Sequence, residues 1–163
     1  MTVPPAKEDP DALNGVQGLL QQGEVAKALE TLNGLTDTVQ SSVMGQYMRG
    51  VCFRLMRDFA NAESVLRQLV EGNPSYGRAF QELGHLYRDA NMPTEALNAY
   101  ATACHLNPGL KASWTAQRDL IGKGSPERAA QINQRLQWLD SLPPALLASW
   151  DLLHEGKLHK AEQ

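Results

Sequence analysis

The chain has 163 residues and a formal net charge of −3, so it is long enough to form one domain with a substantial core. The slight acidic excess argues against a general nucleic-acid binder, because such proteins carry a strong basic excess. No apolar stretch approaches the roughly 20 residues that a membrane span requires, so we expect neither a nucleic-acid nor a membrane partner.

The first ten residues, MTVPPAKEDP, combine prolines and charges without an apolar segment. This composition cannot bury enough surface to become ordered, so we expect residues 1–10 to be a disordered lead-in and not a secretory signal. The only cysteines, Cys52 and Cys104, lie in different predicted helices. The simplest expectation is a cytoplasmic protein with two reduced thiols.

A period of 34 residues runs through the rest of the chain. Alanines recur at positions 28, 62, 96 and 130, and an apolar column holds Leu19, Phe53, Tyr87 and Ile121. Glycine and proline columns hold Gly50 with Gly84 and Pro74 with Pro108. A fixed period of this length is typical of stacked helical repeats.

The first two repeats are predicted at about residues 11–42 and 43–76. The first is the weaker, as is common for a terminal repeat that caps an array. The second keeps the repeat residues Gly50, Phe53, Ala62, Leu66 and Pro74. Polar residues, Gln46 and Arg49, stand where an aromatic residue and a leucine are expected. This departure indicates either a shifted helix or a polar site at the junction.

The third repeat, predicted at residues 77–110, has the most complete pattern. It reads Phe80-x2-Leu83-Gly84-x2-Tyr87, followed by Ala96-x3-Tyr100 and then Pro108. Gly84 and Ala96 are small, so they let paired helices approach closely, and the two tyrosines are predicted to fill the space between those helices. Pro108 has no N–H to continue a helix, so it is predicted to end one.

This pattern resembles the tetratricopeptide repeat, which has an aromatic residue, Leu-Gly, Tyr, Ala-x3-aromatic and Pro in that order. The resemblance implies an all-α fold, a right-handed α-α superhelix of about four repeats plus a truncated fifth over residues 11–163. It also implies a non-catalytic scaffold that binds a protein or peptide on its concave face, which the first helix of each repeat lines.

The fourth repeat is predicted at residues 111–141, with Trp114 in the aromatic column and Ala130 in the alanine column. Ser125 is predicted to cap a helix that runs from Pro126 to about Ser141. A partial fifth repeat follows at 142–163, with a first helix over residues 145–154 and a turn at Gly156–Lys157. Because a half-formed repeat leaves its leucines uncovered, we interpret the chain as a fragment of a longer protein.

The predicted groove combines a stripe from the first helix of the second repeat with one from the third. Its members are Tyr47, Met48, Val51, Arg54, Arg78, Gln81, His85 and Arg88. Arg54 and Arg88 are one repeat apart and are predicted to stack as a basic ladder, which favours a peptide with an acidic element. An ordinary solvated helix face is the alternative interpretation.

No pattern in the chain indicates catalysis. The four histidines lack metal-ligand spacing, and Gly122-Lys123-Gly124-Ser125 lacks the upstream glycine of a phosphate loop. We therefore expect no active site, no cofactor and no metal in this chain.

Two further functions stay open beside the scaffold. The segments LPPALL and LHEGKL, with KAEQ after them, are similar to a stretch of bacterial tetratricopeptide-containing sulfotransferases. That resemblance implies an enzyme whose catalytic domain lies beyond residue 163. The other alternative is a self-association module, because the last half-repeat leaves its apolar stripe uncovered. That stripe comprises Leu146, Leu147, Leu152, Leu153 and Leu158.

Overall fold

The computed structural model describes residues 11–161, with the backbone alone from residue 155 on, so the predicted lead-in at 1–10 lies outside the described residues. Every regular element in the described range is helical, which confirms the predicted all-α class. The chain divides into two compact units, up to Leu69 and from Val70 on, and each is described by itself. None of the helices in residues 11–161 has both the length and the apolar character needed to cross a membrane.

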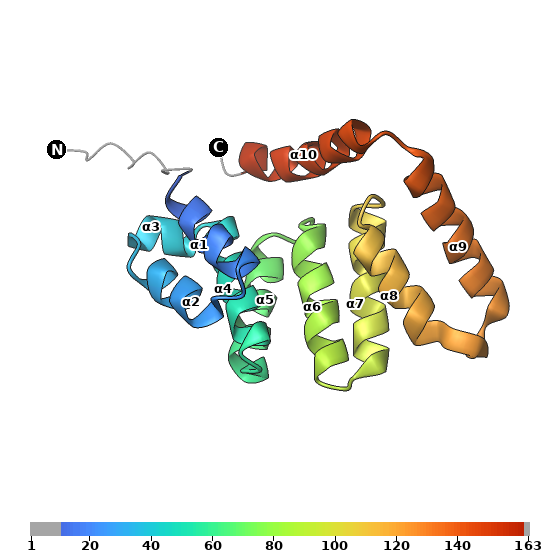
Figure 1. The fold of residues 1–163 in the computed structure, drawn as a ribbon, viewed down its shortest axis with the longest axis horizontal. Helices are drawn as coiled ribbons and strands as arrows, with labels where there is room; N and C mark the ends of the chain where they lie inside the picture. The colour runs from blue at the N-terminus through green and yellow to red at the C-terminus, as the bar shows by residue number, and fades with distance from the viewer. Residues whose placement is uncertain (1–10, 162–163) are drawn as a thin grey trace. The chain divides into compact units, whose positions relative to one another are not determined.

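The first unit contains the helix pairs of the first two repeats (Figure 1). Its helices are α1 (Ala12–Gln21), α2 (Val25–Asn33), α3 (Asp37–Ser41), α4 (Val43–Leu55) and α5 (Phe59–Gly72), the last of which ends beyond the unit boundary. A core cluster joins the first pair to α4 and consists of Val16, Ala28, Leu32, Met48 and Cys52. Apolar residues at helical spacing therefore supply this core, as the repeat pattern predicts.

The short helix α3 is an addition to the two-helix repeat that the sequence analysis did not predict. The Arg49 guanidinium on α4 donates to Asn33 Oδ1 at 2.6 Å and to Gln40 Oε1 at 2.8 Å. Gln46 Nε2 donates to the carbonyl oxygen of Ser41 at 2.8 Å. The two polar departures from the repeat pattern therefore form a polar site that holds α3 against α4.

The second unit contains the third and fourth repeats and the C-terminal helix. Its elements are α6 (Gly77–Asp89), α7 (Pro93–Leu106), α8 (Lys111–Ile121), the 3-10 helix η1 (Gly122–Gly124), α9 (Pro126–Ser141) and α10 (Pro144–Ala161). α9 has the bounds predicted for it. α7 ends two residues before Pro108, and α5 ends two residues before Pro74, so both prolines follow helix ends as expected.

The small residues of the repeat lie at tight helix contacts. A Cβ atom added to Gly84 would lie 2.6 Å from Tyr100 Cδ1, and one added to Gly50 would lie 2.5 Å from Leu66 Cδ2. The alanine column is fully buried at Ala28, Ala62 and Ala96. These contacts confirm the packing role predicted for Gly84 and Ala96, and Gly50, Ala28 and Ala62 pack in the same way.

The turn inside each of the first three repeats is the same motif at the same interval of 34 residues. Gly23, Arg57 and Asn91 have positive φ angles of 78°, 62° and 60°. After each of them, a backbone N–H donates to the carbonyl oxygen five residues earlier: Glu24 to Leu19, Asp58 to Phe53, and Met92 to Tyr87. This is the Schellman motif, which satisfies the last carbonyl groups of the helix and reverses the chain.

The fourth repeat cannot form this turn. Pro126 occupies the position of the donor in the other three repeats, and proline has no N–H. α8 instead ends at Ile121, and Gly122 takes the positive φ angle, 54°, three residues early. Ser125 stands at the helix start, but its side chain makes no capping hydrogen bond, so the predicted serine cap is wrong.

The changed turn is accompanied by a changed orientation of α9 about its own axis. Ala130 is exposed, so the packing role predicted for it is wrong. The buried positions are Ile132 and Leu139, with half-buried Ala129 and Leu136 on the same stripe. Ile132 and Leu139 lie on nearly the opposite side of the helix from Ala130, at about 100° per residue, so α9 does not bury the alanine column.

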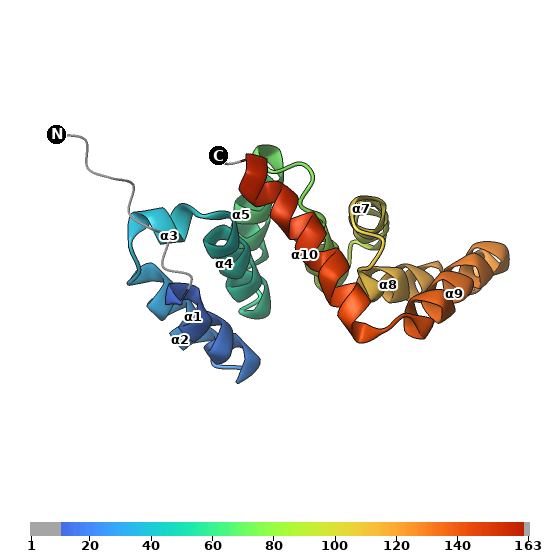
Figure 2. The same ribbon diagram turned by 90° about the horizontal axis from the view of Figure 1, so that it is seen from above.

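α10 turns back after Pro143 and passes the end of α6, as Figures 1 and 2 show from two sides. The Asp151 carboxylate accepts hydrogen bonds from Arg78 Nη2 at 2.9 Å and from Asn107 Nδ2 at 3.0 Å. Trp150 makes an edge contact with Trp138 of α9, with ring centroids 6.0 Å apart. α10 is continuous to Ala161, so the predicted turn at Gly156–Lys157 is wrong.

Candidate functional site

The part of the predicted groove that belongs to the first unit lies on α4. Met48 is only 6% exposed and forms part of the core cluster, so its predicted role as a ligand contact is wrong. Tyr47 is half-buried and packs against the same cluster. Val51 and Arg54 are half-buried as well. Adjacent positions on a helix differ in direction by about 100°, so Tyr47 and Met48 cannot both face outward.

The part of the groove that belongs to the second unit lies on α6 and is held by hydrogen bonds. Gln81 Oε1 accepts from the Ser113 hydroxyl at 2.8 Å, which fixes the amide against α8. His85 Nδ1 and the Tyr100 hydroxyl share a hydrogen bond of 2.6 Å. Gln81 and His85 are half-buried, so each keeps one exposed edge while its hydrogen bond to a buried residue fixes its position.

The two arginines of this stripe differ in their surroundings. Arg78 forms an ion pair with Asp151 of α10. The side chain of Arg88 is 46% exposed and pairs with the neighbouring Asp89 at 3.1 Å. Arg54 belongs to the first unit and Arg88 to the second, so the basic ladder stays a prediction.

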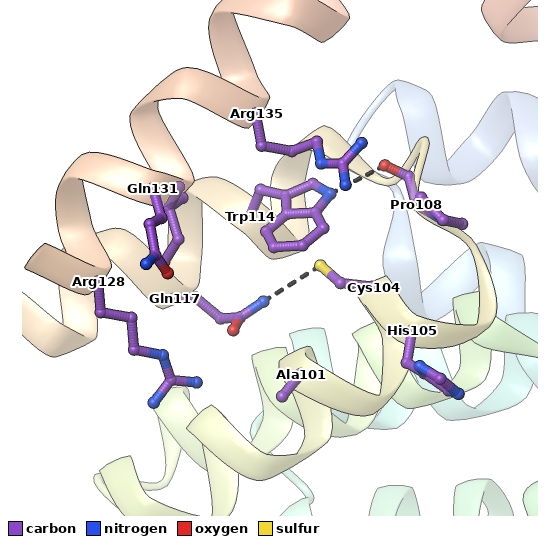
Figure 3. Close-up of a pocket in the computed structure, with 10 residues that line it drawn as sticks. Ala101, Cys104, His105, Pro108, Trp114, Gln117, Arg128, Gln131 and Arg135 are labelled. Carbon is purple, nitrogen blue, oxygen red and sulfur yellow. Dashed lines mark hydrogen bonds between the residues drawn. The ribbon is translucent and has the colours of Figure 1, made fainter.

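The structure also contains a hollow that the sequence analysis did not predict (Figure 3). It has a volume of about 540 Å³ and lies in the second unit between α7, α8 and α9. Its lining residues are Ala101, Cys104, His105, Pro108, Trp114, Gln117, Arg128, Gln131, Ile132 and Arg135. The lining carries two arginines and a histidine but no carboxylate, so the hollow favours a negatively charged ligand.

Two side chains of the hollow are fixed by hydrogen bonds to its wall. Trp114 Nε1 donates to the carbonyl oxygen of Pro108 at 2.8 Å. Gln117, only 3% exposed, donates through Nε2 to Cys104 Sγ at 3.1 Å. The Arg135 guanidinium lies 5.7 Å from the centroid of the Trp114 ring and 5.3 Å from that of Trp138, and these two contacts restrain the arginine.

The two thiols are unreactive by environment. Burial raises the pKa of Cys104 from its ordinary value of 9.0 to about 12, against smaller opposing effects of Gln117 and Arg135. Burial likewise raises the pKa of Cys52 to about 11. Since the thiolate is the nucleophile, both cysteines are protonated and inert at neutral pH. Among the described residues, no group of three or more His, Cys, Asp or Glu side chains could hold a metal ion.

The helix pairs, the glycine contacts and the recurring turn define a helical-repeat fold of the tetratricopeptide type. No protein-family model matches the sequence, and neither does any curated protein. The chain is similar in structure to the protein MamA, with a TM-score of 0.66 and 19% identity over 81% of this chain and 80% of that one.

Two other solved structures show the same likeness. One is residues 41 to the end of MamA from Desulfovibrio magneticus RS-1, with a TM-score of 0.59 and 18% identity over 83% of this chain and 76% of that one. The other is the CopN-Scc3 complex, with a TM-score of 0.58 and 20% identity over 75% of this chain and 72% of that one. These similarities confirm the tetratricopeptide-type fold. The resemblance of residues 142–163 to sulfotransferase repeat regions stays a prediction.

Proposed function

We propose that this chain is a non-catalytic scaffold that binds a segment of another protein on the face of α6. The observation that carries the proposal is the pre-positioned polar stripe of Gln81 and His85, which Ser113 and Tyr100 hold from below. Ordering a free side chain on binding costs about 0.5–1.5 kcal/mol, so side chains that are already held favour association.

Arg88 gives this stripe its charge. It lies one turn beyond His85 on α6, and its guanidinium pairs with Asp89 but is exposed enough to bond a carboxylate of the bound segment as well. The partner expected here is a peptide or protein segment with an acidic element. On the first unit, Arg54 of α4 is the corresponding position one repeat earlier.

A pull-down with three forms of the protein tests the proposal. Proteins captured by the wild type are identified, purified and tested for direct binding. Arg88→Glu is expected to abolish that binding, because it places a negative charge where the acidic element would lie. Arg118→Glu is the matched control, because Arg118 also pairs with the next residue, Asp119, at 3.0 Å. Binding that survives Arg88→Glu, or that is lost equally in both variants, contradicts a site on α6.

Self-association is a second candidate function, which the exposure of α10 favours. Leu152 and Leu153 are 67% and 66% exposed, and Leu146 is 50% exposed. The occupant we propose is α10 of a second copy, whose leucines would cover these. Light scattering should then show a dimer that Leu152→Gln with Leu153→Gln converts to a monomer. A wild-type chain that stays monomeric at high concentration rules this candidate out.

A further inference from the structure

The hollow between α7, α8 and α9 follows from a local change in the repeat. In the first three repeats the Schellman turn sets the start of the second helix. In the fourth, Pro126 prevents that turn, and α9 buries Ile132 and Leu139 in place of the alanine column. With Ile132 buried, its neighbours one turn away on either side, Arg128 and Arg135, lie at the edge of the hollow.

The charges of this hollow are unbalanced. Within the described part of the chain, neither Arg128 nor Arg135 forms an ion pair, whereas Arg88 and Arg118 each pair with a carboxylate. The lining includes no carboxylate that could balance them. Both arginines are exposed at the edge of the hollow, so a bound anion would accept charge-assisted hydrogen bonds from them.

The geometry selects between a small anion and an extended one. Figure 3 shows the Arg135 guanidinium beside Trp114 and the Arg128 guanidinium at the other end of the hollow, beyond Gln117. The two residues are seven positions apart on one helix, which is a rise of about 10.5 Å. A single phosphate or carboxylate is too small to pair with both groups in this arrangement. Two carboxylates on one ligand, roughly 10 Å apart, match it.

The wall between the two arginines is partly apolar. The Trp114 indole and the Ile132 side chain line the hollow, and Trp114 is held in place by its hydrogen bond to Pro108. An extended ligand whose backbone and aliphatic carbon atoms lie between its two acidic groups would cover these surfaces. In polyproline II conformation, residues three apart point the same way and are separated by about 9.3 Å.

We propose that this hollow is a second peptide-binding site, which takes an extended acidic segment with two carboxylates three residues apart. One carboxylate pairs with Arg128 and the other with Arg135, while the carbon atoms of the two acidic side chains and the backbone between them cover Trp114. The site extends the proposed scaffold function to α9, and it shares no residue with the stripe on α6.

Fluorescence polarisation with labelled peptides tests this site directly. The probe contains Glu-Leu-Pro-Glu, and its control contains Gln-Leu-Pro-Gln. Charge-assisted hydrogen bonds contribute about 1.5–3 kcal/mol, so Arg128→Gln and Arg135→Gln should each weaken binding of the glutamate peptide about tenfold or more. Arg118→Gln, a change outside the lining of the hollow and outside the stripe on α6, should leave its affinity unchanged. No binding of the glutamate peptide, or equal binding of the glutamine peptide, overturns the proposal.

Exchanging the charges of the protein and the peptide tests the same pairing. The double variant Arg128→Glu with Arg135→Glu should lose the Glu-Leu-Pro-Glu peptide and bind Lys-Leu-Pro-Lys. Failure to bind the lysine peptide, with helix content and melting temperature retained, contradicts the pairing. Displacement of the glutamate peptide by equimolar inorganic phosphate would show a general anion site and also overturn the proposal. A partner that depends on Arg88 in the pull-down supports the α6 site whatever the peptides do, so the two proposals fail separately.

Discussion

The contact between α6 and α7 at Gly84 makes a quantitative prediction about the fold. In Gly84→Ala, the new Cβ would lie 2.6 Å from Tyr100 Cδ1 and Cε1, whereas carbon atoms pack best at about 3.5–4.0 Å. The ring or the helix must therefore move by about 1 Å. Tyr100 is fully buried and its hydroxyl is bound to His85, so the ring has no free direction in which to swing.

The expected free-energy change combines two opposing effects. Overpacking a core contact costs about 1–3 kcal/mol, while alanine in a helix interior is favoured over glycine by about 0.5–1 kcal/mol. Gly84→Ala should therefore lower the free energy of unfolding by about 1–2 kcal/mol. Urea denaturation followed by circular dichroism measures this difference.

A matched control comes from α1. Gly15 also lies inside a helix, but a Cβ there would meet no heavy atom within 4 Å, so Gly15→Ala should stabilise by about 0.4–1 kcal/mol. In a Tyr100→Leu background, the penalty of Gly84→Ala should shrink, because a flexible side chain replaces the fixed ring. A Gly84→Ala variant that is as stable as Gly15→Ala, or a penalty that is unchanged in that background, would refute the packing described for α6 and α7.

Three other predictions follow from the turns, the inserted helix and the thiols. Gly23→Ala should destabilise by about 1 kcal/mol in a melting experiment, because φ is 78° there and the surrounding space is open. Arg49→Ala should cost about 2 kcal/mol in urea denaturation, because it loses one bond to Asn33 of α2 and one to Gln40 of α3. The cost of the exposed Arg67→Ala should stay below about 1 kcal/mol. Because burial raises the pKa of Cys104 to about 12, its contribution to stability is complete below about pH 9 and falls as the pH rises toward 12. Cys104→Ala should flatten that part of the stability–pH curve, which would otherwise fall by up to about 1.4 kcal/mol per pH unit.

The helix pairs could be predicted because the repeat residues make their contacts inside one repeat. Gly84 and Tyr100 are 16 positions apart, and both the glycine column and the aromatic column follow from that single contact. The candidate groove was harder to predict. Helical spacing shows which residues share one face of a helix, but not which other helices pack against that face. Met48 lies next to Tyr47 in the sequence, yet its side chain belongs to the core. Arg78 pairs with Asp151, which lies 73 positions away in the sequence.

The sequence by itself determined the period, the all-α fold and the small residues at the helix contacts, because these properties repeat with local spacing. Pro126 is also evident in the sequence. Its effect on the turn follows only from the structure, which shows that the residue at this position donates a backbone hydrogen bond in the other three repeats. The tertiary structure alone decided that α9 buries a different face from the alanine column, that Asp151 pairs with Arg78, and that a hollow with two arginines lies beside α8. Contacts between segments far apart in the chain decide these features, and no periodic pattern encodes them.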